Sequence, residues 1–302
     1  MDPARPVHFL HVGDSHVRDL PGDAHLARLS GLVDEVERLL GLGVPVDFLV
    51  HTGDLADAAD EPGATAAPTA RALEALDRLR VPWYALGGNH DRRVFLVEGA
   101  PAHALGAAHP EAADAGPVAP EHADDLPALL GAGIGRRVHG ALEALFLNAN
   151  PEDGRRDLHG AIVPVQVEAL AAHLDALAPG RRAALFLHYP PLAQEAGWTG
   201  QPAGGDALHA ALAPRAARVA GVFAGHVHRG VAHLADGVLH ASVPALSRGF
   251  ALWPGLGHGF DDLPVAGYHY VTVEGAATRV QAHAFVSGGG PGGRDGTGDA
   301  TR

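Results

Sequence analysis

Short apolar runs and longer amphipathic segments alternate through the first third of the chain. Residues 7–12, 46–52 and 81–86 read VHFLHV, VDFLVHT and VPWYAL, which is typical of buried strands. We also expect two helices between these strands, the second of which begins near Pro68. This β-α-β-α-β order requires parallel strands joined by right-handed crossovers, so the sequence predicts an α/β fold. The first helix is indicated by apolar residues at helical spacing, which are Leu26, Leu29, Leu32, Val33, Val36, Leu39 and Leu40.

Regular patterns return in the second half of the chain. They predict strands over 141–150, 182–188 and 219–225, helices over 167–177 and 206–213, a hairpin that turns at Asp236-Gly237, and a closing antiparallel pair over 268–273 and 279–286. Residues 97–137, rich in Ala, Pro, Gly and His, predict an irregular excursion that is either a plain surface connection or a lid or dimer contact. We expect one domain over 1–286 and a disordered Gly-rich tail over 287–302.

Composition excludes several classes of function. The chain has no cysteine, so disulfides, thiolate metal sites and cysteine nucleophiles are excluded. A formal net charge of −13 disfavours binding to a nucleic-acid backbone. No apolar run approaches the ~20 residues of a membrane span, and the N-terminus has no apolar signal-peptide core. We therefore expect a cytoplasmic protein without a membrane partner.

Polar clusters follow five of the predicted strands. Because the carboxyl ends of parallel strands meet at one edge of a sheet, these clusters are expected to lie together. Glycine precedes four of them, and it allows the chain to turn sharply and the backbone to come close to a bound ligand. Aspartate, asparagine and histidine without sulfur suit Mn, Fe, Co or Zn. The clusters are GDSH (Asp14, His16), GDLAD (Asp54, Asp57), GGNHD (Asn89, His90, Asp91), LHYPP (His188) and GHVH (His226, His228).

This ordered set resembles the motifs of the calcineurin-like metallophosphoesterase superfamily, over roughly residues 5–286. The resemblance implies a four-layer α/β/β/α sandwich of two mixed β-sheets flanked by helices. It also implies two divalent or trivalent metal ions that share Asp54. One ion would take Asp14, His16, Asp54 and His228, and the other Asp54, Asn89, His188 and His226.

The resemblance implies a catalytic role for His90, which would protonate the leaving group while a hydroxide shared by the two metals attacks phosphorus. Asp91 would hold the His90 imidazole in its useful tautomer. If either aspartate is taken alone, a helix cap is the favoured interpretation of Asp14 or Asp54, and His188 alone is more often a core histidine than a ligand. We expect Asp57 to cap a helix and to lie outside the site.

Within the superfamily, the chain is most similar to the bacterial class III cyclic-nucleotide and glycerophosphodiester phosphodiesterases. The similarity rests on GNHDRRVF, VPVQVEALAAHL, HYPPLAQEAGW, ASVPALS and VAGYHYVTV. It implies a hydrolase of small-molecule phosphodiesters and allows a homodimer. The alternatives are a phosphomonoesterase of the same superfamily and a non-catalytic scaffold that binds a phosphorylated ligand.

Overall fold

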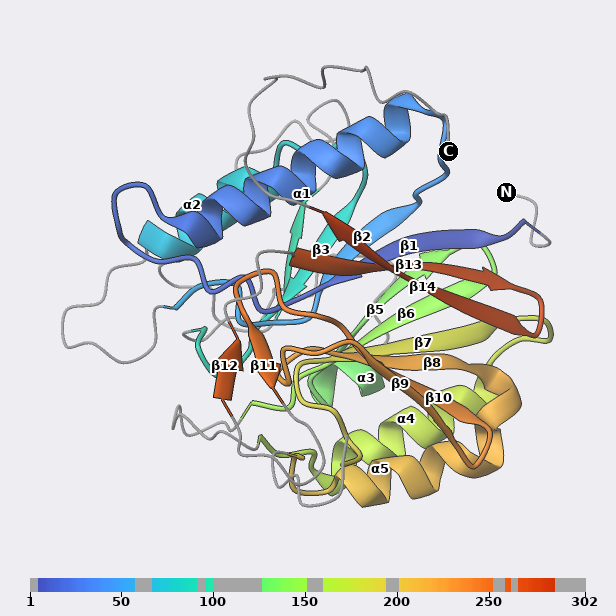
Figure 1. The fold of residues 1–302 in the computed structure, drawn as a ribbon. Coiled ribbons are helices and arrows are strands. Elements are labelled where there is room, and N and C mark those ends of the chain that lie inside the picture. Colours follow the sequence, from blue (N-terminus) through green and yellow to red (C-terminus); the bar gives the residue numbers. More distant parts are fainter. Residues whose placement is uncertain are drawn as a thin grey trace, which may run out of the picture.

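Two six-stranded β-sheets lie face to face between two layers of helices (Figure 1). The strand orders are β14-β13-β1-β2-β3-β4 in the first sheet and β5-β6-β7-β8-β10-β9 in the second. The computed structural model describes residues 5–57, 67–91, 96–99, 127–150, 160–193, 201–251, 259–261 and 266–285. The four-layer sandwich and the parallel pairing expected from the sequence are confirmed.

The first sheet contains the strands of the N-terminal third, β1 (Val7–Val12), β2 (Phe48–His51) and β3 (Trp83–Leu86), which pair in parallel. Antiparallel strands complete it on both sides, namely β4 (Leu96–Gly99), β13 (Ala266–Glu274) and β14 (Ala277–Phe285). Helices α1 (Ala24–Gly41) and α2 (Ala67–Leu76) cover its outer face. Asp23 caps α1, because its carboxylate accepts hydrogen bonds from the backbone N–H groups of His25 and Leu26.

The second sheet repeats this plan with β6 (Leu142–Leu147), β7 (Arg182–Leu187), β8 (Val219–Ala224) and β10 (Val238–Ser242) in parallel. Antiparallel strands β5 (Ile134–His139) and β9 (Val231–Ala235) form its edges. Its outer face packs against α3 (Pro127–Gly131), α4 (Pro164–Ala176) and α5 (Gly205–Leu212), the last continued by a 3-10 helix, η1 (Ala213–Arg218). A small separate sheet pairs β11 (Gly249–Ala251) with β12 (Gly259–Asp261).

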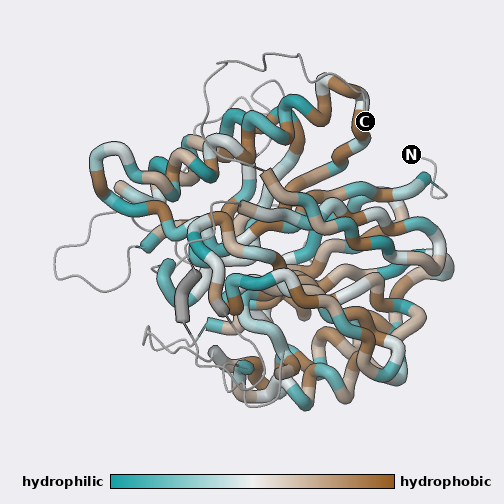
Figure 2. The backbone as a smooth tube through the Cα atoms, viewed as in Figure 1, coloured by the Kyte–Doolittle hydropathy of each residue, from teal (hydrophilic) through white to brown (hydrophobic). Residues whose placement is uncertain are grey.

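The apolar core has three parts that correspond to the three interfaces between layers. One lies between α1–α2 and the first sheet, one between α3–α5 and the second, and the third between the sheets, where Phe9, Phe48, Phe186 and Phe223 pack together. Helix α1 alternates between hydrophilic and hydrophobic segments along its length, as expected for a helix with one face in the core (Figure 2).

Residues 97–137 differ from the sequence expectation. Residues 97–99 belong to β4, and 127–137 form α3 and most of β5, so these parts are regular. Their short, Ala- and Gly-rich segments carry too few apolar positions to show a period. The rest of the expected excursion and the Gly-rich tail lie outside the described residues. In the part of the chain that the structure describes, no helix is long and apolar enough to cross a membrane.

Candidate metal centre

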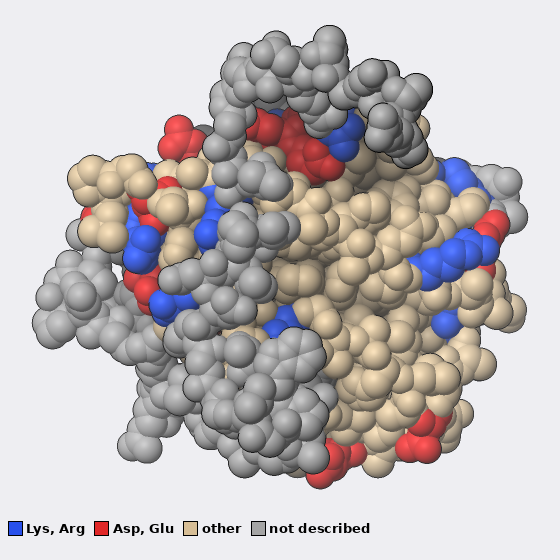
Figure 3. Space-filling model, viewed as in Figure 1, with Lys and Arg blue, Asp and Glu red and all other residues tan. Residues whose placement is uncertain are grey.

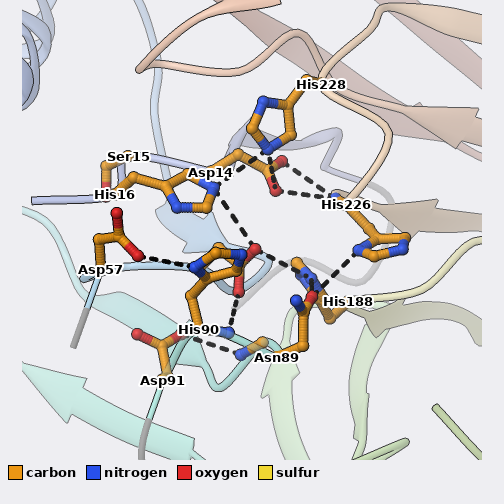
Figure 4. Close-up of polar contacts among 12 residues, drawn as sticks. Asp14, Ser15, His16, Asp57, Asn89, His90, Asp91, His188, His226 and His228 are labelled. Atoms are coloured by element: carbon orange, nitrogen blue, oxygen red, sulfur yellow. Dashed lines mark hydrogen bonds and ion pairs between the residues drawn. The ribbon is translucent and has the colours of Figure 1, made fainter. Parts of the chain in front are cut away.

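The loops after β1, β2, β3, β7 and β8 meet at one end of the sandwich (Figure 4). Backbone hydrogen bonds tie these loops together. The N–H of Asp14 donates to the carbonyl of Gly53 at 2.9 Å, the N–H of His16 to that of Asp54 at 2.9 Å, and the N–H of Gly225 to that of His188 at 3.0 Å. The two sheets therefore contribute side chains to a single cluster, as the sequence predicts.

One half of the cluster contains Asp14, His16, Asp54 and His228, whose potential ligand atoms all lie within 4.8 Å of one another. His16 Nε2 lies 3.0 Å from His228 Nε2 and 3.4 Å from Asp54 Oδ2. His228 Nε2 lies 3.5 Å from Asp14 Oδ1. All four residues are buried. Nitrogen and oxygen lone pairs thus converge on one small volume.

The other half contains Asp54, His188 and His226, which also bring ligand atoms within 4.8 Å of one another. Asn89 joins them, because its Oδ1 lies 3.0 Å from His188 Nε2 and 3.1 Å from His226 Nδ1. His188 Nε2 is 3.5 Å from Asp54 Oδ2. Asp54 therefore lies next to histidines of both halves.

The backbone is strained at this cluster. Positive φ angles occur at Asp14 (55°), His16 (46°), Asp54 (53°), His226 (68°) and His228 (53°). Non-glycine residues rarely adopt this conformation, and it persists only where the surrounding structure imposes it. These loops are held in an unfavourable conformation that directs several lone pairs to the same place.

Hydrogen bonds from Nδ1 orient the rings of His188 and His228. His188 Nδ1 donates to the carbonyl of Thr52 at 2.9 Å, and His228 Nδ1 donates to the carbonyl of Arg248 at 2.9 Å. In each ring the opposite nitrogen, Nε2, then presents a lone pair to the cluster. This is the usual support for a histidine that binds a metal.

Burial and mutual charge perturb the titration of the cluster. Burial raises the pKa of Asp14 to about 8, and burial lowers the pKa of His226 to about 3 and that of His228 to about 4. Burial opposes ionisation of Asp54, yet the neighbouring His188 and His16 rings hold its pKa well below its usual range. Burial lowers the pKa of His188, but the charge of Asp54 outweighs it and raises that pKa to about 9, so this part of the cluster favours a positive charge. A buried set of imidazole and carboxyl groups with this preference is well suited to cations.

His90 lies beside the cluster with its ring 4.5 Å from that of His16, centroid to centroid. Its Nδ1 is 2.8 Å from Asp57 Oδ1, and its side chain is 22% exposed. Burial lowers the pKa of His90, but the hydrogen bond to Asp57 and the charge of Asp54 outweigh it and raise that pKa above its ordinary value. The His90 imidazole, at the edge of the site, is therefore protonated more readily than a free imidazole.

The prediction that Asp91 orients His90 is wrong, and so is the exclusion of Asp57 from the site. The Asp91 carboxylate accepts hydrogen bonds from the backbone N–H groups of Leu55 (3.0 Å), Ala56 (2.9 Å) and Gly88 (2.9 Å). Asp91 thus clamps the loop after β2 to the loop after β3. Adjacent residues on the tight turn point in different directions, so sequence adjacency misled the assignment (Figure 4).

Asp14 and Asp54 do not cap the described helices that follow them. Helix α1 is capped by Asp23, and the side chains of Asp14 and Asp54 lie in the cluster. Sequence reasoning missed Ser15, whose hydroxyl lies 3.0 Å from His51 Nε2 and donates to the carbonyl of Leu55 at 2.8 Å. Ser15 thus connects the loop after β1 to β2 and the loop that follows it. In the sequence, only its position between the ligand candidates Asp14 and His16 could have suggested this.

Comparisons with known proteins identify the family and the fold of the chain. The family model described as calcineurin-like phosphoesterase matches residues 7–230. The chain is similar in structure to a dimetal phosphatase from Danio rerio, with 15% identity and a TM-score of 0.61, over 95% of this chain and 100% of that chain. It is also similar to a purple acid phosphatase from yellow lupin seeds, with 14% identity and a TM-score of 0.59, over 95% of this chain and 52% of that chain. No curated protein sequence matches the chain. At these identities the two structures show a shared fold.

Proposed function

The chain belongs to the calcineurin-like phosphoesterase family, and from this premise we propose that it hydrolyses small-molecule phosphodiesters with two metal ions. The observation that carries the proposal is the double cluster, in which Asp54 contacts both halves. If two cations are bound, Asp54 would contribute to both, because a carboxylate has two oxygens.

We assign one ion to Asp14, His16, Asp54 and His228, and the other to Asp54, Asn89, His188 and His226. The donor set fits Mn, Fe, Zn or Co, because it combines imidazole nitrogens with carboxylate and amide oxygens. When bound, the ions would generate a nucleophile from water at neutral pH and neutralise charge on the phosphoryl oxygens.

His90 is the proposed general acid. Its Nδ1 is engaged by Asp57, which leaves Nε2 to carry a proton to the departing oxygen of the substrate. Because the His90 side chain is partly exposed while the proposed metal ligands Asp14, Asp54 and His188 are almost fully buried, His90 is accessible to a substrate that lies over the cluster. Asp57 acts through His90 as a positioning residue.

Diesters such as cyclic nucleotides or glycerophosphodiesters are the proposed substrates, supported by the sequence similarity to class III phosphodiesterases. The face drawn in Figure 3 agrees with a small ligand, because its described Arg atoms occur as scattered side chains rather than as one basic surface.

The test compares turnover of bis(p-nitrophenyl) phosphate and p-nitrophenyl phosphate by one Mn²⁺-loaded preparation, with metal content measured on the same sample. We expect two ions per chain and a higher kcat/KM for the diester. A panel of cyclic nucleotides and glycerophosphodiesters then ranks natural diesters. Faster cleavage of the monoester would identify a phosphomonoesterase instead, and metal binding without cleavage of either would indicate a binding scaffold.

A further inference from the structure

The Tyr189 ring packs against two histidines, His188 and His226, in one half of the metal cluster. The Tyr189 side chain is fully buried. The ring centroid lies 4.8 Å from that of His188 in an edge-to-face arrangement, and 4.8 Å from that of His226 at a tilt of 59°. On the other side is Gly160, where an added Cβ would come within 2.5 Å of the tyrosine ring carbons. The ring is therefore held tightly, and it limits rotation of both imidazoles.

Hydrogen bonds connect the Tyr189 hydroxyl to the loop that carries Asn89. The hydroxyl donates to Asn150 Oδ1 at 3.1 Å, and Asn150 Nδ2 donates to the carbonyl of Gly87 at 2.9 Å. The backbone N–H of Asn150 donates to Asn148 Oδ1 at 3.1 Å, which fixes the Asn150 residue itself. A continuous chain of hydrogen bonds thus runs from Tyr189 to a point two residues before Asn89.

The other half of the cluster is supported by different groups. His228 is oriented by the carbonyl of Arg248, and the carbonyl of His16 accepts a hydrogen bond from His25 Nδ1 at 2.7 Å. Ser15 connects the Asp14–His16 loop to the loop after β2. The two halves share Asp54 and also meet where the N–H of His226 donates to the Asp14 carboxylate at 2.9 Å, but the groups that orient His228 and the His16 backbone differ from those around Tyr189.

We propose that Tyr189 and Asn150 form a positioning pair that serves the Asn89–His188–His226 half of the cluster selectively. This inference rests on the proposed function, since it assumes that this half binds one of two metals. Tyr189 limits the two imidazole orientations, and Asn150 holds the turn that presents the Asn89 oxygen. Residues that orient metal ligands typically influence affinity by about 10–100-fold.

The test is a calorimetric titration of the metal-free chain with Mn²⁺ alone, compared for the unmodified chain, Tyr189→Phe and Tyr84→Phe. Tyr84 is the matched control, because it is also buried and its hydroxyl is hydrogen-bonded to His139 Nε2 at 3.1 Å between the sheets. We expect two binding steps in the unmodified chain, and in Tyr189→Phe one step weakened about tenfold or more with the other unchanged. Tyr84→Phe should keep both steps.

Two further measurements separate positioning from general destabilisation. Thermal unfolding of the metal-free chains should show similar losses for Tyr189→Phe and Tyr84→Phe, since each removes a partly buried hydrogen bond of a tyrosine hydroxyl. Asn150→Ala should weaken the same step as Tyr189→Phe, and the double variant should lose no more than the larger single loss, because both act through one link.

Unchanged affinity at both steps in Tyr189→Phe would overturn the inference, and so would an equal weakening of both. If the unmodified chain binds no Mn²⁺, the proposed function fails first and the inference fails with it. If Mn²⁺ binds in two steps but no phosphoester is cleaved, the selective loss in Tyr189→Phe would still support the positioning pair.

Discussion

His90 differs from the proposed metal ligands in its exposure and in its partner. It lies at the edge of the cluster and contacts Asp57, which agrees with the proposal that it is a general acid. We predict that His90→Ala keeps both metals and lowers kcat by roughly 10²–10⁴-fold, the usual contribution of a general acid. Metal analysis and steady-state kinetics on the same sample test this.

The dependence on leaving group checks the role of His90 further. Alkyl alcohols need a proton as they depart more than p-nitrophenolate does, so the loss in His90→Ala should be larger for an alkyl diester. His233→Ala, at a partly buried histidine on β9, is the control and should retain activity. An equal loss on both kinds of substrate would argue against proton donation by His90.

Asp57 is predicted to act only through His90. The 2.8 Å contact between the Asp57 carboxylate and His90 Nδ1 fixes the tautomer and the ring orientation. Asp57→Asn should therefore lower kcat by about tenfold with metal content unchanged, and the loss should vanish in a chain that already carries His90→Ala. A double-mutant cycle on kcat measures this coupling, and additive losses would assign Asp57 an independent role.

At the scale of elements, the sequence predicts that the polar residues after the strands lie close together, because parallel strands of one sheet end at the same edge. Runs such as VHFLHV and VDFLVHT end at glycine followed by aspartate, and the structure brings those aspartates into one cluster. Side-chain direction on the tight turns was not predictable. Asn89, His90 and Asp91 are consecutive, yet they point respectively to the histidines, to Asp57 and to backbone N–H groups.

Gly88 shows why these loops need glycine. A Cβ at this position would lie 2.3 Å from Asp54 Oδ1 and 2.5 Å from the Asp54 nitrogen, closer than real contacts allow. We predict that Gly88→Ala displaces Asp54, weakens binding of both metals and lowers the free energy of unfolding by about 1–3 kcal/mol through overpacking. Metal titration and chemical denaturation measure the two effects.

Gly41, at the end of α1, is the matched control for this substitution. No atom outside the helix lies within 4 Å of a Cβ there, so Gly41→Ala should leave metal binding intact. Alanine also has a higher helix propensity, which predicts unchanged or slightly higher stability. If Gly88→Ala bound both metals as tightly as Gly41→Ala, the close packing around Asp54 would not be needed for the site.

At the scale of the whole molecule, the cluster joins the two sheets. Asp14, Asp54 and Asn89 follow strands of the first sheet, whereas His188 and His226 follow strands of the second. Metal binding should therefore stabilise the sandwich as a unit. A metal concentration of 100 times Kd adds about 2.7 kcal/mol, so we predict that chelation lowers Tm and that Mn²⁺ restores it. Scanning calorimetry with and without chelator tests this, and an unchanged Tm would contradict it.

Glu143 connects the edge of the second sheet to its helix layer. Its carboxylate contacts Arg136 Nε at 2.6 Å on β5 and His173 Nε2 at 2.9 Å on α4, and its side chain is almost fully buried. Burial alone would raise the pKa of Glu143, but the hydrogen bonds from His173 and Arg136 outweigh it and hold that pKa at about 2, against a usual value of 4.5.

The sign of the resulting pH dependence follows from that depressed pKa. The charged carboxylate stabilises the fold at any pH above the unfolded-state pKa near 4.5, and this contribution is lost as the pH falls towards 2. We predict that Glu143→Gln lowers the free energy of unfolding at pH 7 by about 2–3 kcal/mol, because Arg136 and His173 lose a buried partner. Urea denaturation from pH 7 to pH 2 should show the difference between the two chains shrinking below pH 4.5.

Glu274→Gln is the control for this prediction, since Glu274 pairs with Arg279 on the surface of the β13–β14 hairpin. Exposed pairs contribute about 0–1 kcal/mol, so its stability should follow that of the unmodified chain at every pH. A difference between Glu143→Gln and the unmodified chain that stays constant from pH 7 to pH 2 would show that packing, rather than the charge of Glu143, holds β5, β6 and α4 together.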